Sequence, residues 1–146
     1  MRFRKVCVER AGGAPVILVG GSREKIRAAL RAGTSVLGLV DVPGGGAVLA
    51  PVTLLGHEAG LPDGLVRIAG DEHVPIVGYV ASLDARDGTR RIRFTRLPDD
   101  REGAMRTLAA LLDAAIRSDP AAWHFWSEWP RFAKPASRDE GVAGLR

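Results

Sequence analysis

The stretch that decides the fold is VPIVGYVASLDARDGTRRIRFTR, residues 74–96. Its first part, residues 74–83, is almost entirely apolar or small and contains the β-branched and aromatic residues that favour strands. The second part, residues 89–96, alternates arginine or threonine with Ile92 and Phe94, which predicts a strand with one face in water. Asp87-Gly88 between them is a turn signal. The stretch therefore predicts a β-hairpin whose Ile92 and Phe94 point into the protein.

Helices and further strands are predicted on both sides of this hairpin. Three segments have the apolar periodicity of helices: residues 23–31, 63–72 and 101–118. Four segments have the composition of strands: residues 6–8, 15–19, 35–40 and 48–52. The run at 35–40 is apolar throughout, as expected of a strand buried on both faces. The order of these elements predicts an α/β fold, with a mixed sheet and flanking helices.

Length and composition are those of one globular domain. The 146 residues carry a net charge of +4, and 46% of them are hydrophobic. We expect a single α/β domain over residues 1–132 and a flexible tail over 133–146. The single cysteine, Cys7, excludes an internal disulfide and a cysteine-based zinc site, and no metal is predicted. The basic charge permits nucleic acid, anionic lipid or a phosphorylated ligand as partner.

The sequence contains neither a secretory signal nor a membrane-spanning segment. The basic residues that follow Met1 lead into no apolar run of the kind a signal peptide requires. No apolar run approaches the roughly 18 residues that a transmembrane helix needs. These patterns predict a cytoplasmic protein, with at most a peripheral association with the inner face of the cell membrane.

A set of short motifs points to a family. They follow one another in this order: Leu30-Arg31-Ala32-Gly33, the apolar run to Asp41, Leu54-Leu55-Gly56, the Gly-containing residues 56–64, Ile68-Ala69 with residues 74–77, and finally Ile116, Pro120, Trp123 and Arg131-Phe132. In these residues the chain resembles the C-terminal half of the bacterial lipid A biosynthesis acyltransferases of the lauroyl/myristoyl type. The resemblance covers about residues 25–132 and extends to the fold expected for that half.

The resemblance implies an activity, but one catalytic motif of the family is missing from this sequence. Members of the family transfer a fatty acyl chain from an acyl carrier protein or coenzyme A thioester to a glycolipid hydroxyl. Their N-terminal half carries a membrane-anchoring helix and an H-x-x-x-x-D motif, in which histidine is the general base and aspartate orients it. Here the position five residues after His57, His73 or His124 is proline, glycine or tryptophan. We therefore expect a truncated or split substrate-side half that needs a partner chain carrying H-x-x-x-x-D.

Several residues are candidates for substrate binding. Asp41 follows the predicted buried strand, where α/β sheets display ligand contacts, although it can equally cap a loop. Three glycines, Gly44, Gly45 and Gly46, would let a phosphate or acyl headgroup approach the backbone, but no Lys-Ser follows them as in a P-loop, and a mobile loop is the other interpretation. Arg91 and Arg93 would face phosphate-bearing lipid, or simply water.

Two other hypotheses remain open. The first is a non-catalytic module whose basic hairpin and Trp-rich end, residues 123–129, meet an anionic membrane surface or another protein. The expected inward direction of Phe94 leaves no stacking aromatic among the arginines, which argues against nucleic acid. The second is a self-contained enzyme in which His57, placed in a Gly/Pro loop, forms a base–orienter pair with Asp63 or Glu58.

Overall fold

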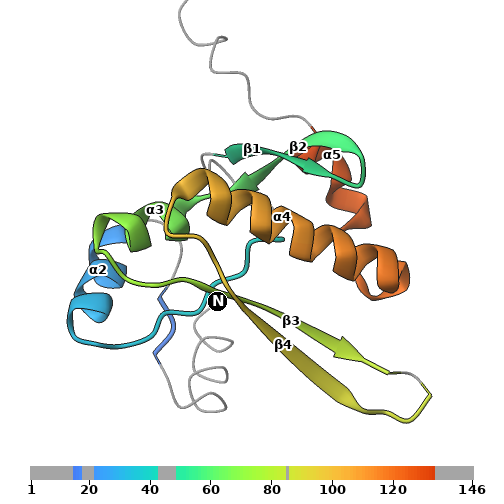
Figure 1. Ribbon diagram of the computed structural model, residues 1–146, viewed down its shortest axis with the longest axis horizontal. Helices are drawn as coiled ribbons and strands as arrows, with labels where there is room; N and C mark the ends of the chain where they lie inside the picture. Colours follow the sequence, from blue (N-terminus) through green and yellow to red (C-terminus); the bar gives the residue numbers. More distant parts are fainter. Residues whose placement is uncertain (1–14, 18–21, 43–48, 85, 134–146) are drawn as a thin grey trace, which may run out of the picture. The chain divides into compact units, whose positions relative to one another are not determined.

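The computed structural model describes residues 15–17, 22–42, 49–84 and 86–133. The fold is mixed α/β, and the chain divides into two compact units, Met1–Leu37 and Gly38–Arg146 (Figure 1). Several predictions lie wholly or almost wholly outside the described residues: the strand at 6–8, the glycines at 44–46, and the tail. Of the predicted strand at 15–19, residues 15–17 are described, and they form no strand.

The first unit contains the predicted helix at residues 23–31, here α2 (Arg23–Arg31). The helix ends because Gly33 adopts a φ of 74°, a left-handed conformation that suits glycine. The Thr34 N–H then donates to the Ala29 carbonyl at 2.9 Å and closes the last turn. The helix and its glycine stop are confirmed.

The second unit begins with a hairpin that the sequence predicted only in part. Strand β1 (Leu49–Leu54) pairs antiparallel with β2 (His57–Pro62) through the two-residue turn Leu55-Gly56. Both turn residues have positive φ, 55° and 83°, as a type I′ turn requires. The expected edge strand at 48–52 therefore exists, but the expected loop around His57 is a strand.

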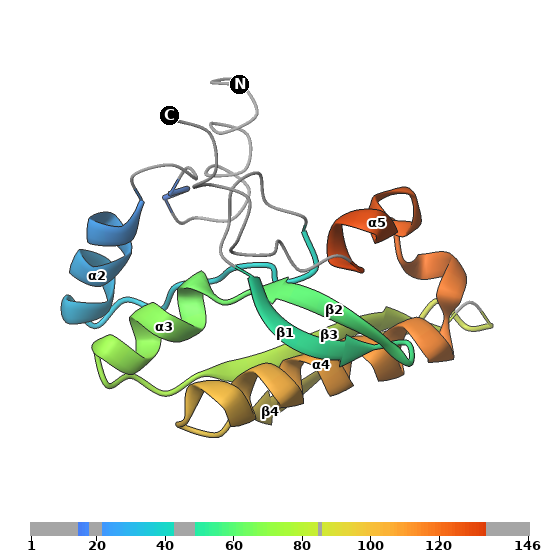
Figure 2. The same cartoon turned by 90° about the horizontal axis from the view of Figure 1, so that it is seen from above.

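A short helix, a second hairpin and a long helix complete this unit. They are α3 (Gly64–Asp71), β3 (Val77–Leu83) paired antiparallel with β4 (Arg90–Arg96), and α4 (Arg101–Ser118). Figures 1 and 2 show α4 running between the two hairpins, and it contacts both β1 and β3. Its start is fixed by Asp100, whose side chain accepts a hydrogen bond from the Gly103 N–H at 2.7 Å.

The core forms around α4. Leu54 and Leu61 of the first hairpin and Leu97 after the second pack with its apolar side, which is made of Met105, Leu108 and Ile116. The chain then passes through two 3₁₀ turns, η1 (Pro120–Ala122) and η2 (Trp126–Glu128), into α5 (Trp129–Phe132). Trp123 is buried at the centre of an aromatic cluster, with its ring centroid 4.9 Å from that of Trp126 and 5.7 Å from that of Phe132.

The prediction of a buried strand at residues 35–40 is wrong. No strand is formed there, and the side chains of Leu37 and Leu39 are 74% and 63% exposed. A strand needs a neighbour to pair its backbone groups, and within the described residues the two sheets are separate hairpins. Within the second unit, Gly38 lies against Leu65 of α3, where a β-carbon on residue 38 would overlap Leu65 Cδ1.

The predicted second hairpin is confirmed, but its faces are reversed. Phe94 and Ile92 are 68% and 59% exposed instead of buried. The cause is the position of α4, which packs on the opposite face at Gly78. A β-carbon on this residue would lie 3.0 Å from Leu111 Cδ1 and 3.3 Å from Leu97 Cδ2. Because side chains alternate along a strand, the face that carries Phe94 points away from α4.

Within the described ranges, no helix combines the length and the apolar character needed to cross a bilayer.

One contact ties the first hairpin to α4. The Leu55 N–H of the β1–β2 turn donates to Asp113 Oδ1 at 2.6 Å, and Arg117 Nε donates to the other oxygen at 2.5 Å. The hydrogen bond from Arg117, and after it the bond from the Leu55 backbone, hold the pKa of the Asp113 carboxyl below its usual range.

We predict that Asp113→Asn lowers the free energy of unfolding at neutral pH by about 1 kcal/mol, because it removes a charged acceptor of two hydrogen bonds. Because the pKa of Asp113 is lower in the folded state, its carboxylate stabilises the fold above about pH 4. This stabilisation is lost as the pH falls through the folded-state pKa. The difference between wild type and variant, measured by urea unfolding, should therefore shrink in acid. A difference that stays constant from pH 7 to pH 2 contradicts this assignment.

Candidate functional site

Asp63 is the one charged residue that is fully buried in the described part of the chain. It stands between β2 and α3, and one of its carboxylate oxygens accepts a hydrogen bond from the Arg101 guanidinium at the start of α4. Its Oδ1 has no hydrogen-bond partner among the described protein atoms. Burying a charge is costly unless it is paired, so Arg101 is the group that makes this position tolerable for a carboxylate.

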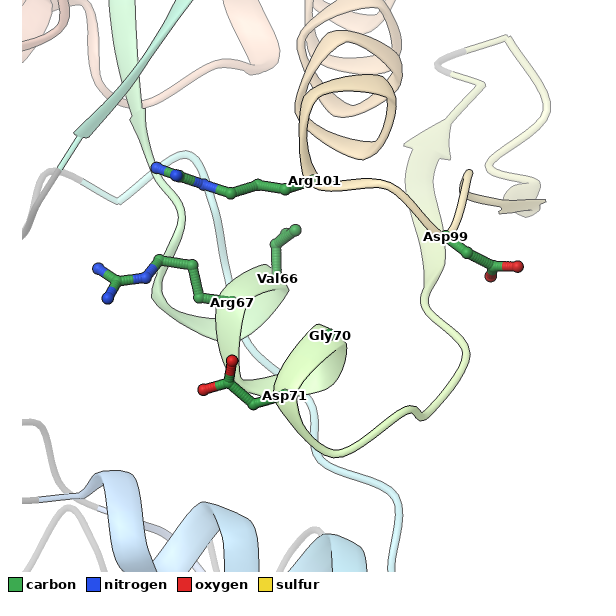
Figure 3. Close-up of a pocket in the computed structure, with 6 residues that line it drawn as sticks. All are labelled: Val66, Arg67, Gly70, Asp71, Asp99 and Arg101. Carbon is green, nitrogen blue, oxygen red and sulfur yellow. The ribbon is translucent and has the colours of Figure 1, made fainter.

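A depression of about 270 Å³ lies beside this pair, between α3 and the start of α4. Its lining residues are Val66, Arg67, Gly70, Asp71, Asp99 and Arg101 (Figure 3). In the close-up the guanidinium groups of Arg67 and Arg101 extend toward the same side, while Asp99 points away from the other side chains. Two arginines and two aspartates nearly balance in charge, so the depression does not concentrate cationic groups for an anionic ligand.

The structure does not bring His57 and Asp63 together. They stand at the start of β2 and directly after its end, roughly 20 Å apart at the rise of an extended strand. The His57 ring instead lies edge-on to Trp129, with centroids 6.0 Å apart. Glu58 is the next residue along the strand, so its side chain points to the opposite face. The predicted base–orienter pair is absent because the expected loop is an extended strand.

The other predicted substrate residues are spread over the unit. Asp41 is half-buried in a bend, next to Val40, which packs on the core. Arg91 and Arg93 are exposed on one face of β4, where Arg91 lies 3.8 Å from Asp84. Among the described contacts none joins Asp41 to either arginine, so the structure gathers only the two arginines. Within the same residues, no three His, Cys, Asp or Glu side chains converge as a metal site.

The feature that the sequence analysis missed is the exposed apolar face of the second hairpin. Four members alternate along β3, two of them stand opposite apolar residues of β4, and Arg96 and Arg90 stand opposite the first and the last: Val77, Tyr79, Ala81, Leu83, Ile92 and Phe94. Tyr79 and Phe94 face each other across the strands with ring centroids 6.2 Å apart. Gly78 was the available signal, because a glycine within an alternating strand marks the face that another element approaches closely.

No protein-family model matches the chain, and no curated protein matches it.

We predict that Arg101→Met lowers the free energy of unfolding by about 3 kcal/mol, because it leaves the buried Asp63 carboxylate unpaired. Arg67→Met is the matched control: it removes an arginine that lines the same depression, and it should change stability by less than about 0.5 kcal/mol. Asp63→Asn in the Arg101→Met background should recover part of the loss, since a neutral amide is less costly to bury. Equal urea midpoints for Arg101→Met and Arg67→Met would show that the Asp63–Arg101 ion pair does not stabilise the fold.

Proposed function

We propose that this chain is the substrate-side half of an acyltransferase that transfers a fatty acyl chain from a carrier-protein or coenzyme A thioester to a glycolipid hydroxyl. A second polypeptide carrying H-x-x-x-x-D supplies the catalytic base. The ordered motifs from Leu30 to Phe132 support the family.

The observation that carries the proposal is the apolar face of the β3–β4 hairpin that the other described residues leave uncovered. Strand β3 carries apolar or small side chains on both of its faces, yet α4 covers only the face that contains Gly78. The exposed side chains include Leu39 in the second unit, besides Phe94 and Ile92. A large exposed apolar face marks a surface that another molecule covers. A complementary half-domain is the occupant that an acyltransferase fold divided in two requires.

The chemistry divides between the two halves. The histidine of the partner takes the proton of the acceptor hydroxyl, whose oxygen attacks the thioester carbonyl; the carbon–sulfur bond then breaks, and the departing thiolate is protonated. This chain contributes binding. Arg91 and Arg93 present exposed guanidinium groups from one face of β4, and guanidinium groups bind phosphate through paired hydrogen bonds. They would hold a phosphorylated glycolipid acceptor.

The alternative, a non-catalytic module at an anionic surface, has less support from the Trp-rich end. Trp123 is buried in the aromatic cluster. Trp126 is 45% exposed, and its Nε1 donates to the Pro120 carbonyl at 2.7 Å. Trp123 thus belongs to the core and the Trp126 indole is held by this hydrogen bond, which leaves the arginines of β4 as the main basis of that hypothesis. The self-contained enzyme has less support as well, because His57 does not contact Asp63 and Glu58 points to the opposite face of β2.

We predict that this chain alone does not transfer acyl groups, and that adding the polypeptide encoded immediately upstream, which should carry H-x-x-x-x-D, produces thioester-dependent transfer to a glycolipid. Replacing the histidine of that motif by alanine should abolish transfer, whereas His57→Ala in this chain should leave the rate unchanged. The measurement is release of free thiol from an acyl thioester. Activity of this chain alone that is lost in His57→Ala would establish the self-contained enzyme instead.

A further prediction concerns the acceptor. In the two-chain enzyme, Arg91→Gln with Arg93→Gln should raise the KM for a phosphorylated glycolipid about tenfold, corresponding to roughly 1.4 kcal/mol of binding, with little change in kcat. Arg106→Gln on the exposed side of α4 is the control. The same acceptor without its phosphate should not distinguish the variants. An equal rise in KM for both acceptors would mean that the arginines do not bind phosphate.

A further inference from the structure

At the outer edge of β3, backbone groups have no partner among the described residues. At the two ends of the ladder, the Leu97 N–H donates to the Ile76 carbonyl at 3.0 Å and the Asp84 N–H donates to the Thr89 carbonyl at 2.9 Å. Antiparallel pairs alternate between hydrogen-bonded and non-hydrogen-bonded, so the even-numbered residues of β3 bond to β4. The N–H and C=O groups of the odd-numbered residues point away from β4: Val77, Tyr79, Ala81 and Leu83. Within the described chain no third strand pairs with this edge.

The same four residues direct their side chains onto the exposed apolar face. Phe94 and Ile92 of β4 stand opposite the two central residues, Tyr79 and Ala81, while the two outer residues stand opposite Arg96 and Arg90. Tyr79 with Phe94 is one of the close, non-hydrogen-bonded pairs. The free edge and the apolar face therefore form one continuous surface. We call this the β3 surface; it consists of Val77, Tyr79, Ala81, Leu83, Ile92 and Phe94.

Charge distinguishes the two edges of the hairpin. Strand β3, from Val77 to Leu83, contains no charged residue, whereas β4 contains Arg90, Arg91, Arg93 and Arg96. Charged side chains on an edge strand discourage pairing with another strand, and an uncharged, apolar edge without proline invites it. Of the two edges, β3 is the one suited to receive a strand.

We propose that the outer edge of β3 pairs with a strand of a second polypeptide, and that the same polypeptide covers the apolar face of the hairpin. The hairpin thereby becomes part of a larger sheet covered on both faces. The identity of this partner, the half that carries H-x-x-x-x-D, rests on the proposed function, while the docking surface rests on the geometry of β3.

A polypeptide fits this surface better than a bilayer or a second copy of the chain. The hydrocarbon of a bilayer offers no hydrogen-bonding groups to an open strand edge, so the free N–H and C=O groups of β3 would remain unsatisfied there. Two copies joined edge to edge by a twofold axis normal to the sheet would satisfy those groups. They would leave both apolar faces uncovered on the same side of the joined sheet.

The decisive variant is Ala81→Pro in the full chain. Proline removes the outward N–H of residue 81 but breaks no bond to β4, so the hairpin should remain folded, as far-ultraviolet circular dichroism and the urea midpoint report. Affinity for the upstream-encoded polypeptide should fall at least tenfold. Ala81→Ser keeps the N–H and is the matched control. For the apolar face, Phe94→Ser should weaken binding, and Trp126→Ser, which changes another exposed aromatic residue, should not.

Hydrogen exchange adds a readout at each residue. In the complex, exchange should slow at the amides of Val77, Tyr79, Ala81 and Leu83, while the even-numbered amides are already slow in the free chain. Binding by Ala81→Pro at wild-type affinity, or a complex in which these four amides stay fast, overturns the proposal. The proposal is also overturned if hydrogen exchange at the four amides slows without the partner, either as the concentration of this chain rises or when phosphatidylglycerol vesicles are added. A complex in which the four amides are protected but no acyl transfer occurs supports the docking surface and contradicts the proposed function. Acyl transfer without protection of these amides supports the function and contradicts the docking surface.

Discussion

The approach of α4 to β3 at Gly78 is the contact on which the second unit depends. A single helix provides the apolar side against which both hairpins pack, and it can lie close to β3 only because residue 78 has no side chain. That contact decides which face of β3–β4 is covered. Every second residue of β3 then points outward, and the apolar residues of β4 opposite them are exposed as well. The uncovered face follows from one glycine and the twofold periodicity of strands.

Local rules were sufficient for the helices and for the pairing of β3 with β4. Helices α2 and α4 occupy the residues predicted from periodicity, because their hydrogen bonds close within each segment. The register of the second hairpin follows from its turn, in which Gly88 has a φ of 71°. These features depend on residues near one another in the sequence, which is why the sequence alone could predict them.

Features that need a distant partner could not be predicted in this way. The run at residues 35–40 has the composition of a buried strand, but composition cannot supply the neighbouring strand that would pair with it. The direction of Phe94 depended on where α4 packs. The pairing of Asp63 with Arg101 joins residues 38 positions apart, and no spacing in the sequence signals it. Of the candidate site, the sequence identified the arginines of β4 correctly as exposed, while it mistook a strand for the loop that would have held His57 near Asp63.

The two proposals place different ligands on opposite faces of one hairpin. Arg91 and Arg93 stand opposite Ser82 and Val80, on the face that α4 approaches at Gly78, and both remain exposed. Phe94 and Ile92 alternate with them and belong to the β3 surface. Because alternate residues of a strand cannot share a face, a polypeptide docked on the β3 surface does not cover the two guanidinium groups. Docking and acceptor binding therefore do not compete, as an enzyme assembled from two polypeptides requires.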